Sequence, residues 1–264
     1  PRRAAMSVYT DVPRAALDTF LGAYDLGPAV SWDGILDAVN SNIGSGTMTF
    51  SRGVGAGTFN PAVPFTLDSG NANSAAALGI GDFNGDGNLD VAVSDLTTDE
   101  VNLFRGNGAG SFLAPTTAAT GVFPRGIGVA DFNEDGIADV AVANRGVDGD
   151  AGNDSVTVLF GAVGGTFVAG PTLVAEDRPN AVRCLDVNGD GNQDIAITNS
   201  GAGSNSVLIY LGQGDGTFSA PLDIPSNGTA PTGLEVADFN NDTLLDFVVG
   251  NNNSLQVSVF LQTQ

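Results

Sequence analysis

A nine-residue motif, Asp-x-Asn-x-Asp-Gly-x-x-Asp, occurs four times and constrains the fold more than any other feature of the sequence. The copies begin at Asp82, Asp131, Asp186 and Asp238, which are 49, 55 and 52 residues apart, and only Thr243 departs from the glycine at position 6. Self-similarity at a period of about 50 residues indicates repeated supersecondary units. The sequence therefore predicts a repeat architecture, in which each unit carries one copy of the motif.

The spacing of the polar residues predicts a metal-binding loop. Side-chain oxygens at positions 1, 3 and 5 of a tight turn can converge on one point, and a backbone carbonyl at position 7 and a carboxylate at position 9 can complete the site. All-oxygen sites suit hard cations such as Ca²⁺, which takes about 6–8 oxygen ligands. Glycine at position 6 permits the sharp turn. Asp, Asn and Gly also mark ordinary turns, but four copies in register favour calcium.

The flanking residues place each loop between β-strands. A short alternating run before each loop predicts a strand with one apolar face, and a continuous apolar run after it predicts a strand buried on both faces. A third strand and a Gly-rich turn closed by an aromatic residue and a proline follow, as in Gly106–Phe112 with Pro115. Four strands in about 50 residues is the size of a propeller blade. Position 12, a glutamate in EF-hands, is here Val93, Val142, Ile197 or Val249.

Residues 47–264 resemble the FG-GAP/VCBS repeats, which form the blades of the integrin α-subunit propeller and of many bacterial surface proteins. Besides the Asp loops, the resemblance rests on Phe160-Gly161 and on Ala114-Pro115, Gly170-Pro171 and Ala220-Pro221. It implies an all-β fold, a β-propeller of four-stranded blades. The length of the chain allows about four to five blades, or part of a larger propeller. It also implies up to four Ca²⁺ ions, one per blade.

The resemblance also implies the ligands of each ion. The side-chain ligands are Asp82, Asn84, Asp86 and Asp90 in the first loop, Asp131, Asn133, Asp135 and Asp139 in the second, Asp186, Asn188, Asp190 and Asp194 in the third, and Asp238, Asn240, Asp242 and Asp246 in the fourth. The backbone carbonyls of Asn88, Ile137, Asn192 and Leu244 complete the sets.

Residues 1–46 are interpreted as a separate segment outside the repeats. Asp11-Val12-Pro13 predicts a helix start, and apolar residues follow at helical spacing as far as Tyr24. Residues 6–42 resemble the amino-terminus of bacterial homoserine kinase, but no later segment resembles its nucleotide-binding lobe, so we expect no kinase activity. A gene fusion, a start-site artefact and a chance amphipathic helix all remain open. We expect deletion of residues 1–44 to leave the β domain folded.

Charge and composition exclude several classes of function. The net charge of −21 and the pI of about 4.1 disfavour nucleic-acid binding, which needs a basic surface. The absence of histidine removes His-based catalysis and His metal ligands, and the single cysteine, Cys184, is read as a small core residue. No apolar run approaches the ~20 residues of a membrane helix. Pro1–Ala5 lacks the apolar stretch that follows in a signal peptide, so an extracellular or cell-surface location is expected from the family resemblance alone.

These observations predict a non-catalytic, calcium-binding interaction or adhesion module whose partner is a protein or a glycan. A lectin-like propeller and an accessory domain of a secreted enzyme are the alternatives, and an open ring would permit self-association through unpaired edges. Arg125, Arg145 and Arg183 are rare positive charges that could contact an acidic partner or be solvated. We expect the Thr243 loop to bind calcium most weakly, and Asp139→Ala to weaken binding more than Asn133→Ala, with a loss of stability confined to calcium.

Overall fold

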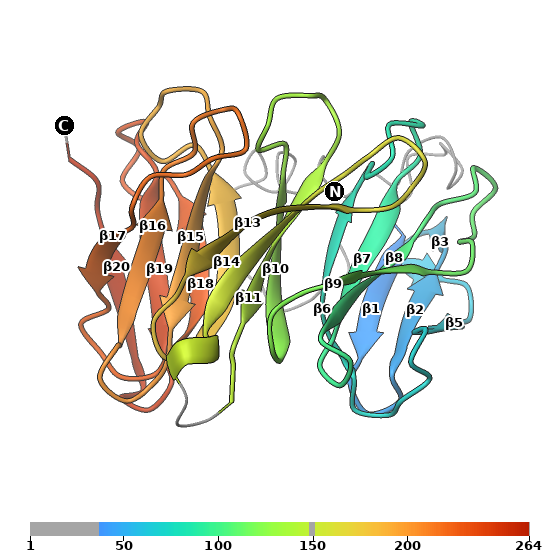
Figure 1. Cartoon of the computed structure of the whole chain (residues 1–264), viewed down its shortest axis with the longest axis horizontal. Helices are drawn as coiled ribbons and strands as arrows, with labels where there is room; N and C mark the ends of the chain where they lie inside the picture. The colour runs from blue at the N-terminus through green and yellow to red at the C-terminus, as the bar shows by residue number, and fades with distance from the viewer. Residues whose placement is uncertain (1–36, 148–150, 264) are drawn as a thin grey trace.

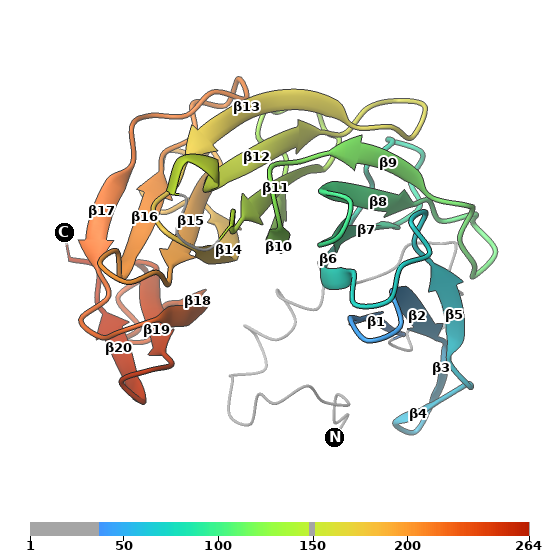
Figure 2. The same ribbon diagram turned by 60° about the horizontal axis from the view of Figure 1, so that its bottom comes forward.

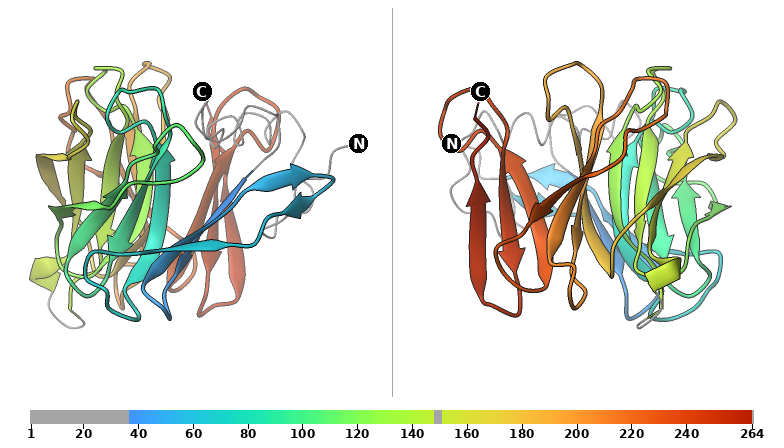
Figure 3. Two further views of the ribbon diagram at one scale, coloured as in Figure 1. Left: turned by 90° about the vertical axis from the view of Figure 1, so that its right-hand side faces the viewer. Right: turned by 60° about the vertical axis from the view of Figure 1, so that its left-hand side comes forward.

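The protein is an all-β propeller-like arc of sheets in the computed structural model, which describes residues 37–147 and 151–263. Five antiparallel sheets follow one another around the arc, and the first strands of the middle sheets lie on its inner side (Figures 1 and 2). In side view the strands run between two opposite ends of the sheets, where the connecting loops lie (Figure 3). The fold class predicted from the repeats is confirmed.

The three middle sheets each contain four strands in sequence order, as a propeller blade does. Their strands are β6 (Ala75–Gly81), β7 (Asp90–Asp95), β8 (Glu100–Phe104) and β9 (Thr116–Ala119); β10 (Pro124–Ala130), β11 (Asp139–Asn144), β12 (Ser155–Phe160) and β13 (Val168–Val174); and β14 (Pro179–Leu185), β15 (Asp194–Asn199), β16 (Ser206–Tyr210) and β17 (Leu222–Pro225).

The sheets at the two ends of the arc have three described strands each. They are β1 (Ala38–Asn42), β2 (Thr47–Ser51) and β5 (Val63–Thr66) at one end, and β18 (Pro231–Ala237), β19 (Asp246–Asn251) and β20 (Gln256–Phe260) at the other. A small hairpin, β3 (Gly53–Gly55) with β4 (Thr58–Phe59), extends from the first sheet. The one helical element described is the 3-10 turn Ala151–Asn153, and no described helix has the length and apolarity needed to cross a membrane.

The core lies between neighbouring sheets. Every residue of β7, β11 and β15 is buried, which confirms for these three strands the prediction that the apolar run after the loop is buried on both faces. In β19, which follows the fourth loop, Val248 and Gly250 are only half-buried. Val101 and Leu103 of β8 pack with Val140 and Val142 of β11, and all four are fully buried. Burying one such side chain stabilises the fold by roughly 1.5–3 kcal/mol, so each sheet depends on the next for its stability.

Close packing of the first strands explains two glycines of the repeat. A Cβ at Gly79 would lie 2.5 Å from a methyl group of Val129, and one at Gly128 would lie 2.5 Å from the sulfur of Cys184. Larger residues at these positions would therefore force adjacent sheets apart. Burial raises the pKa of the Cys184 thiol to about 12, which agrees with its interpretation as a neutral core residue.

The first sheet begins upstream of the boundary expected at Thr47. β1 pairs with β2 from Ala38–Ser51 to Asn42–Thr47, and Val39 packs against the buried core that includes Met48 and Phe50. Residues 38–42 therefore belong to the first sheet, including Val39–Asn42, which carried part of the kinase resemblance. The predicted helix after Asp11, and the rest of that resemblance, lie outside the described residues. The physical reason for the earlier boundary is that β1 supplies both the pairing partner and an apolar neighbour of β2.

Two truncations test this boundary. Removing residues 1–36 leaves every described strand, whereas removing residues 1–44 also deletes β1 and uncovers one edge of β2. We expect the longer truncation to be less stable than the shorter one by about 2–3 kcal/mol, the cost of exposing one or two core side chains. Urea denaturation followed by circular dichroism would measure the difference. Equal stability of the two proteins would restore the boundary at Thr47.

Candidate metal-binding loops

The four Asp loops occupy equivalent places in four consecutive sheets. Each connects the first strand of its sheet to the second, and these connections are residues 82–90, 131–139, 186–194 and 238–246. Because the strands before and after each loop pair in the same antiparallel register, the loops lie at the same end of successive sheets. The fold therefore brings four chemically alike loops to the same end of four consecutive sheets.

The carboxylate at position 1 organises the loop backbone. In the first loop, Oδ1 of Asp82 accepts the N–H of Gly85 at 2.8 Å and that of Asp86 at 3.2 Å, while Oδ2 accepts the N–H of Gly87 at 2.8 Å. In the other three loops the N–H groups of positions 5 and 6 donate to the position-1 carboxylate at 2.8–3.1 Å. These bonds wrap the turn around the carboxylate and bring position 5 next to position 1.

Positions 3 and 5 are joined in the same way in all four loops. The amide nitrogen of the position-3 asparagine donates to Oδ2 of the position-5 aspartate at 2.9–3.0 Å. The asparagine oxygen in turn accepts the position-5 N–H at 2.8–3.1 Å. The side chains of positions 1, 3 and 5 are therefore adjacent, as the spacing predicted.

The position-9 aspartates make a different contact, which the sequence did not reveal. Asp90, Asp139, Asp194 and Asp246 are fully buried. Asp139 accepts the N–H of Phe132 at 2.9 Å and the N–H of Gly161 at 2.8 Å. One donor lies at position 2 of the loop and the other follows the third strand, so each carboxylate ties three strands of its sheet together. The equivalent pairs in the other loops are Phe83 with Gly106, Val187 with Gly212, and Phe239 with Gln262.

In the three middle sheets the donor after the third strand is a glycine, because the chain there passes close to the backbone of the loop. A Cβ at Gly106 would lie 2.3 Å from the carbonyl oxygen of Leu89, and one at Gly161 would lie 2.2 Å from that of Ala138. A side chain there would push the strand away from the loop and lengthen the bond to the position-9 carboxylate. This close approach gives a physical reason for the Phe160-Gly161 pair on which the family resemblance partly rests.

The pKa is shifted in opposite directions at two buried aspartates and at one exposed aspartate of the loops. Burial raises the pKa of Asp90 and of Asp139 to about 7, although their backbone N–H donors lower it, and the nearby charges at positions 1 and 5 raise it further. The exposed Asp190 at position 5 behaves oppositely, because the N–H of Asn192 and the amide of Asn188 lower its pKa. In the third loop these donors thus favour the ionised form of the position-5 carboxylate.

Positions 1, 3 and 5 fit a hard cation, because they offer only oxygen ligands. These are the carboxylates of positions 1 and 5, which water can reach, and the amide oxygen of position 3. No group of three or more His, Cys, Asp and Glu side chains is gathered as a metal centre in residues 37–147 and 151–263. The position-9 carboxylate is engaged by two N–H groups, and the position-7 residues contribute N–H bonds to position 5 at 2.8–2.9 Å. Coordination by position 9 and by the position-7 carbonyls stays a prediction.

The backbone at position 6 has the left-handed conformation that the sequence predicted. Its φ angle is 82° at Gly87, 84° at Gly136 and 94° at Gly191, and Thr243 is held at 76°. A β-branched residue in this region is strained. Position 4 also has a positive φ, 56° at Glu134, a second requirement that the sequence analysis missed although Gly or Asn occupies this position in the other loops.

A fifth position-9 aspartate was also missed. Asp37 immediately precedes β1, and its Oδ1 accepts the N–H of Gly53 at 2.6 Å, as Asp90 accepts that of Gly106. The signal in the sequence was Asp33-Gly-Ile-Leu-Asp37, which matches the second half of the motif. It was overlooked because the first half, at residues 29–32, lacks Asp and Asn.

Replacing Asp139 by alanine would leave two buried N–H groups without an acceptor. Each unsatisfied group costs about 1–3 kcal/mol, so we expect Asp139→Ala to lower the free energy of unfolding by about 2–4 kcal/mol in EDTA as well as in calcium. This differs from the expectation drawn from the sequence, in which the loss occurred only in calcium. Urea denaturation in both buffers would measure it, and a loss confined to calcium would show that the two N–H contacts contribute little.

Thr243 offers a test of backbone strain in the fourth loop. A non-glycine residue held at positive φ costs on the order of 1–3 kcal/mol, and the extra chain entropy of glycine offsets part of that gain. We expect Thr243→Gly to raise the stability by about 1 kcal/mol. Gly136→Ala is the matched control, because its Cβ would meet no atom within 4 Å, and it should lower stability through φ alone. The prediction fails unless Thr243→Gly raises the free energy of unfolding and Gly136→Ala lowers it.

Comparison with known proteins agrees with this geometry. The model of the FG-GAP-like repeat matches residues 32–93, 82–142 and 186–249, more than half of the chain. A search of curated protein sequences found no match. The first match begins before β1, in agreement with the sheet boundary described above.

Solved structures share the fold at low sequence identity. A periplasmic gluconolactonase of Pseudomonas aeruginosa is 17% identical with a TM-score of 0.62, over 89% of this chain and 65% of that one. A lectin of Agrocybe aegerita that recognises non-reducing terminal N-acetylglucosamine is 22% identical, with a TM-score of 0.54 over 87% and 63%. A Lactobacillus plantarum protein is 16% identical, with a TM-score of 0.58 over 86% and 67%.

This chain thus spans about two thirds of the length of each of these structures. Identities of this size show a common propeller fold and nothing of substrate or ligand. The family model, in contrast, covers the loops and strands from which the site is built. The chain belongs to the family of FG-GAP-like repeat proteins.

Proposed function

We propose that the chain is a non-catalytic, calcium-binding interaction module of a secreted or cell-surface protein, with integrin α-like adhesion as its closest functional type. The observation that supports this proposal most is the identical arrangement of positions 1, 3 and 5 in four loops at one end of the sheets. In all four loops the N–H of position 5 donates to the position-3 asparagine, at distances within 0.3 Å of one another.

The chemistry of the loops favours calcium over other metals. Their ligands are carboxylates and amide oxygens, which suit hard cations, whereas zinc and copper prefer imidazole or thiolate. The chain has no histidine, and its one cysteine is partly buried and packs against the core. Mg²⁺ demands a near-octahedral site of small radius, while Ca²⁺ accepts the irregular geometry of a flexible loop.

In this proposal the ion has a structural role. It would neutralise the carboxylates at positions 1 and 5, which repel each other in a chain of net charge −21, and would stiffen the connection between the first and second strands. Side chains at positions 1, 3 and 5 would hold it. Extracellular modules bind calcium with dissociation constants of roughly 10⁻⁴–10⁻³ M, which suits the proposed location.

A lectin-like function is the second candidate, because one structural neighbour is a lectin. Glycan sites generally use exposed aromatic platforms. Tyr210, the one Tyr or Trp in the described ranges, is buried, with its hydroxyl donating to the carbonyl of Val174. This observation favours a protein partner, and binding to a glycan array would reverse the preference.

An enzymatic function receives less support. The carboxylate pairs that glycoside hydrolysis needs occur here four times in one pattern, whereas an active site is normally single. A role as an accessory domain of a secreted enzyme fits the same loops.

Self-association has a specific candidate surface, since Val257 and Val259 of β20 are 68% and 55% exposed on an edge strand that no described strand covers.

Calcium should stabilise the protein, and more strongly at higher calcium concentration. We expect the thermal midpoint to rise by several degrees between 1 mM EDTA and 5 mM Ca²⁺, since a ligand that binds only the folded state stabilises by RT ln(1 + [L]/Kd). Asp135→Asn should remove part of the increase, because Asp135 has an exposed carboxylate. Asp215→Asn, which removes an exposed carboxylate outside the Asp loops, should leave it unchanged. Equal midpoints with EDTA and calcium, or equal effects of the two variants, would contradict the proposal.

A further inference from the structure

A cavity lies at the end of the sheets opposite to the one that carries the Asp loops. Its volume is about 380 Å³, and it is lined by the beginnings of β6, β10 and β14 together with Ile43 of the β1–β2 turn. Each of these three strands ends at an Asp loop, so their beginnings are at the far end of the sheets. They lie on the inner side of the arc (Figure 2). The cavity is within the size range of small-molecule sites, about 300–1,000 Å³, and its lining does not include the candidate metal loops.

The charge of the cavity wall is opposite to that of the chain. Arg125 and Arg183 line it, and its lining contains no Asp or Glu. The chain has only nine basic residues against 30 acidic ones. Two arginines at one small cavity are therefore a local exception in a strongly acidic protein.

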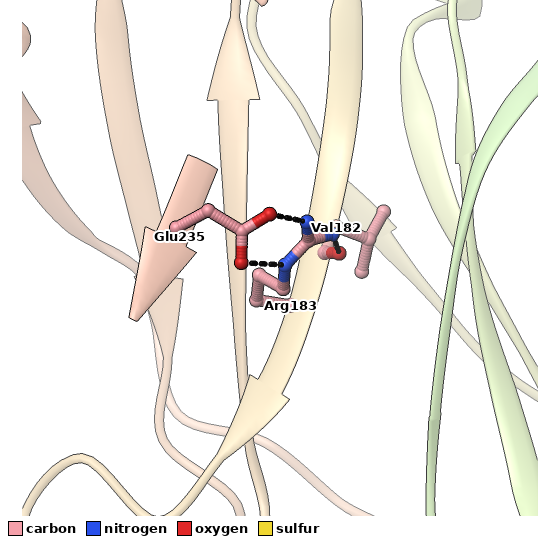
Figure 4. Close-up of polar contacts among 3 residues, drawn as sticks. All are labelled: Val182, Arg183 and Glu235. Atoms are coloured by element: carbon pink, nitrogen blue, oxygen red, sulfur yellow. Dashed lines mark hydrogen bonds and ion pairs between the residues drawn. The ribbon is translucent and has the colours of Figure 1, made fainter. Parts of the chain in front are cut away.

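Arg183 is held in place at this wall. It occupies the position at which the two preceding first strands have Gly79 and Gly128, and its guanidinium contacts both carboxylate oxygens of Glu235 on β18 (Figure 4). Its Nη1 also donates to the carbonyl of Val182 at 2.9 Å. A guanidinium fixed by a carboxylate fork loses little further conformational entropy when a ligand binds beside it.

Arg125 has no such partner. Its guanidinium makes neither a hydrogen bond nor an ion pair in the part of the chain that the structure describes. The side chain is half-buried, and burial lowers its pKa, as does the neighbouring charge of Arg145. Removing a cation from water without an opposite charge is costly. An anion in the cavity would offset that cost.

The remaining lining indicates the shape of the anion. Leu78, Ile127 and Val182 contribute apolar surface, and Asn180 brings an amide group. A guanidinium group can form two parallel N–H···O bonds to a planar carboxylate. A tetrahedral anion fits this cavity less well, because its remaining oxygens would face apolar walls. We propose that this cavity binds a small organic carboxylate with an apolar body, with Arg125 as the residue that contacts the carboxylate.

The proposal is tested with benzoate as the probe and benzamide as its neutral counterpart. Isothermal titration of the full chain should show benzoate binding at least tenfold tighter than benzamide, because a charge-assisted hydrogen bond depends on the negative charge. Arg125→Gln should weaken benzoate at least tenfold. Arg52→Gln removes the same charge from an exposed residue outside the cavity and should change the affinity less than twofold.

Several results would overturn the proposal. Absence of benzoate binding at 10 mM would do so, as would equal affinity for benzamide or equal losses in Arg125→Gln and Arg52→Gln. Inorganic phosphate binding more tightly than benzoate would overturn the choice of a carboxylate. Urea denaturation of both variants in the absence of ligand keeps the comparison valid, because Arg125→Gln removes a half-buried charge without a partner and should unfold at a midpoint no lower than that of the wild type. The outcome is independent of calcium binding, which concerns the opposite end of the sheets.

Discussion

The buried carboxylate at the start of the second strand is the contact on which each sheet depends. In four consecutive sheets it accepts one N–H from the beginning of the Asp loop and another from one or two residues beyond the third strand. In the sheet that precedes these four, Asp37 accepts the N–H of Gly53 in the same way. A carboxylate in a fully buried position needs such donors, because an unsatisfied buried charge is costly. The carboxylate therefore couples the conformation of the loop to the position of the strand end.

This contact also gives the Asp loop two parts with different tasks. Position 9 is buried and holds the strands, while positions 1, 3 and 5 arrange oxygen atoms around a tight turn whose position-5 carboxylate is exposed. A cation bound at positions 1, 3 and 5 would bind a loop that the position-9 carboxylate already holds to the sheet. The proposed calcium role is thus one of stiffening an existing turn, and the sheets themselves derive most of their stability from the apolar cores between them.

The sequence predicted the parts of this arrangement that repeat with the chain. The 50-residue period, the buried second strand and the left-handed position 6 all follow from local patterns of Val, Ile, Gly and Asp. The contact between Asp139 and Gly161 was not predictable, because it joins residues of different strands. The first sheet was placed too late because the sequence before it has neither Asp nor Asn at residues 29 and 31, and only Asp33-Gly-Ile-Leu-Asp37 matches the motif there. The cavity arises where residues of three separate sheets meet, which no local pattern encodes.

The number of calcium ions bound per chain tests the central claim most directly. Native mass spectrometry of the protein at millimolar calcium, with an EDTA-treated sample and a magnesium sample as references, would count them. The account predicts up to four calcium ions per chain, lost with EDTA and not replaced by magnesium at equal concentration. A mass equal to that of the metal-free chain at millimolar calcium would contradict it, and the loops would then be turns held by their own hydrogen bonds.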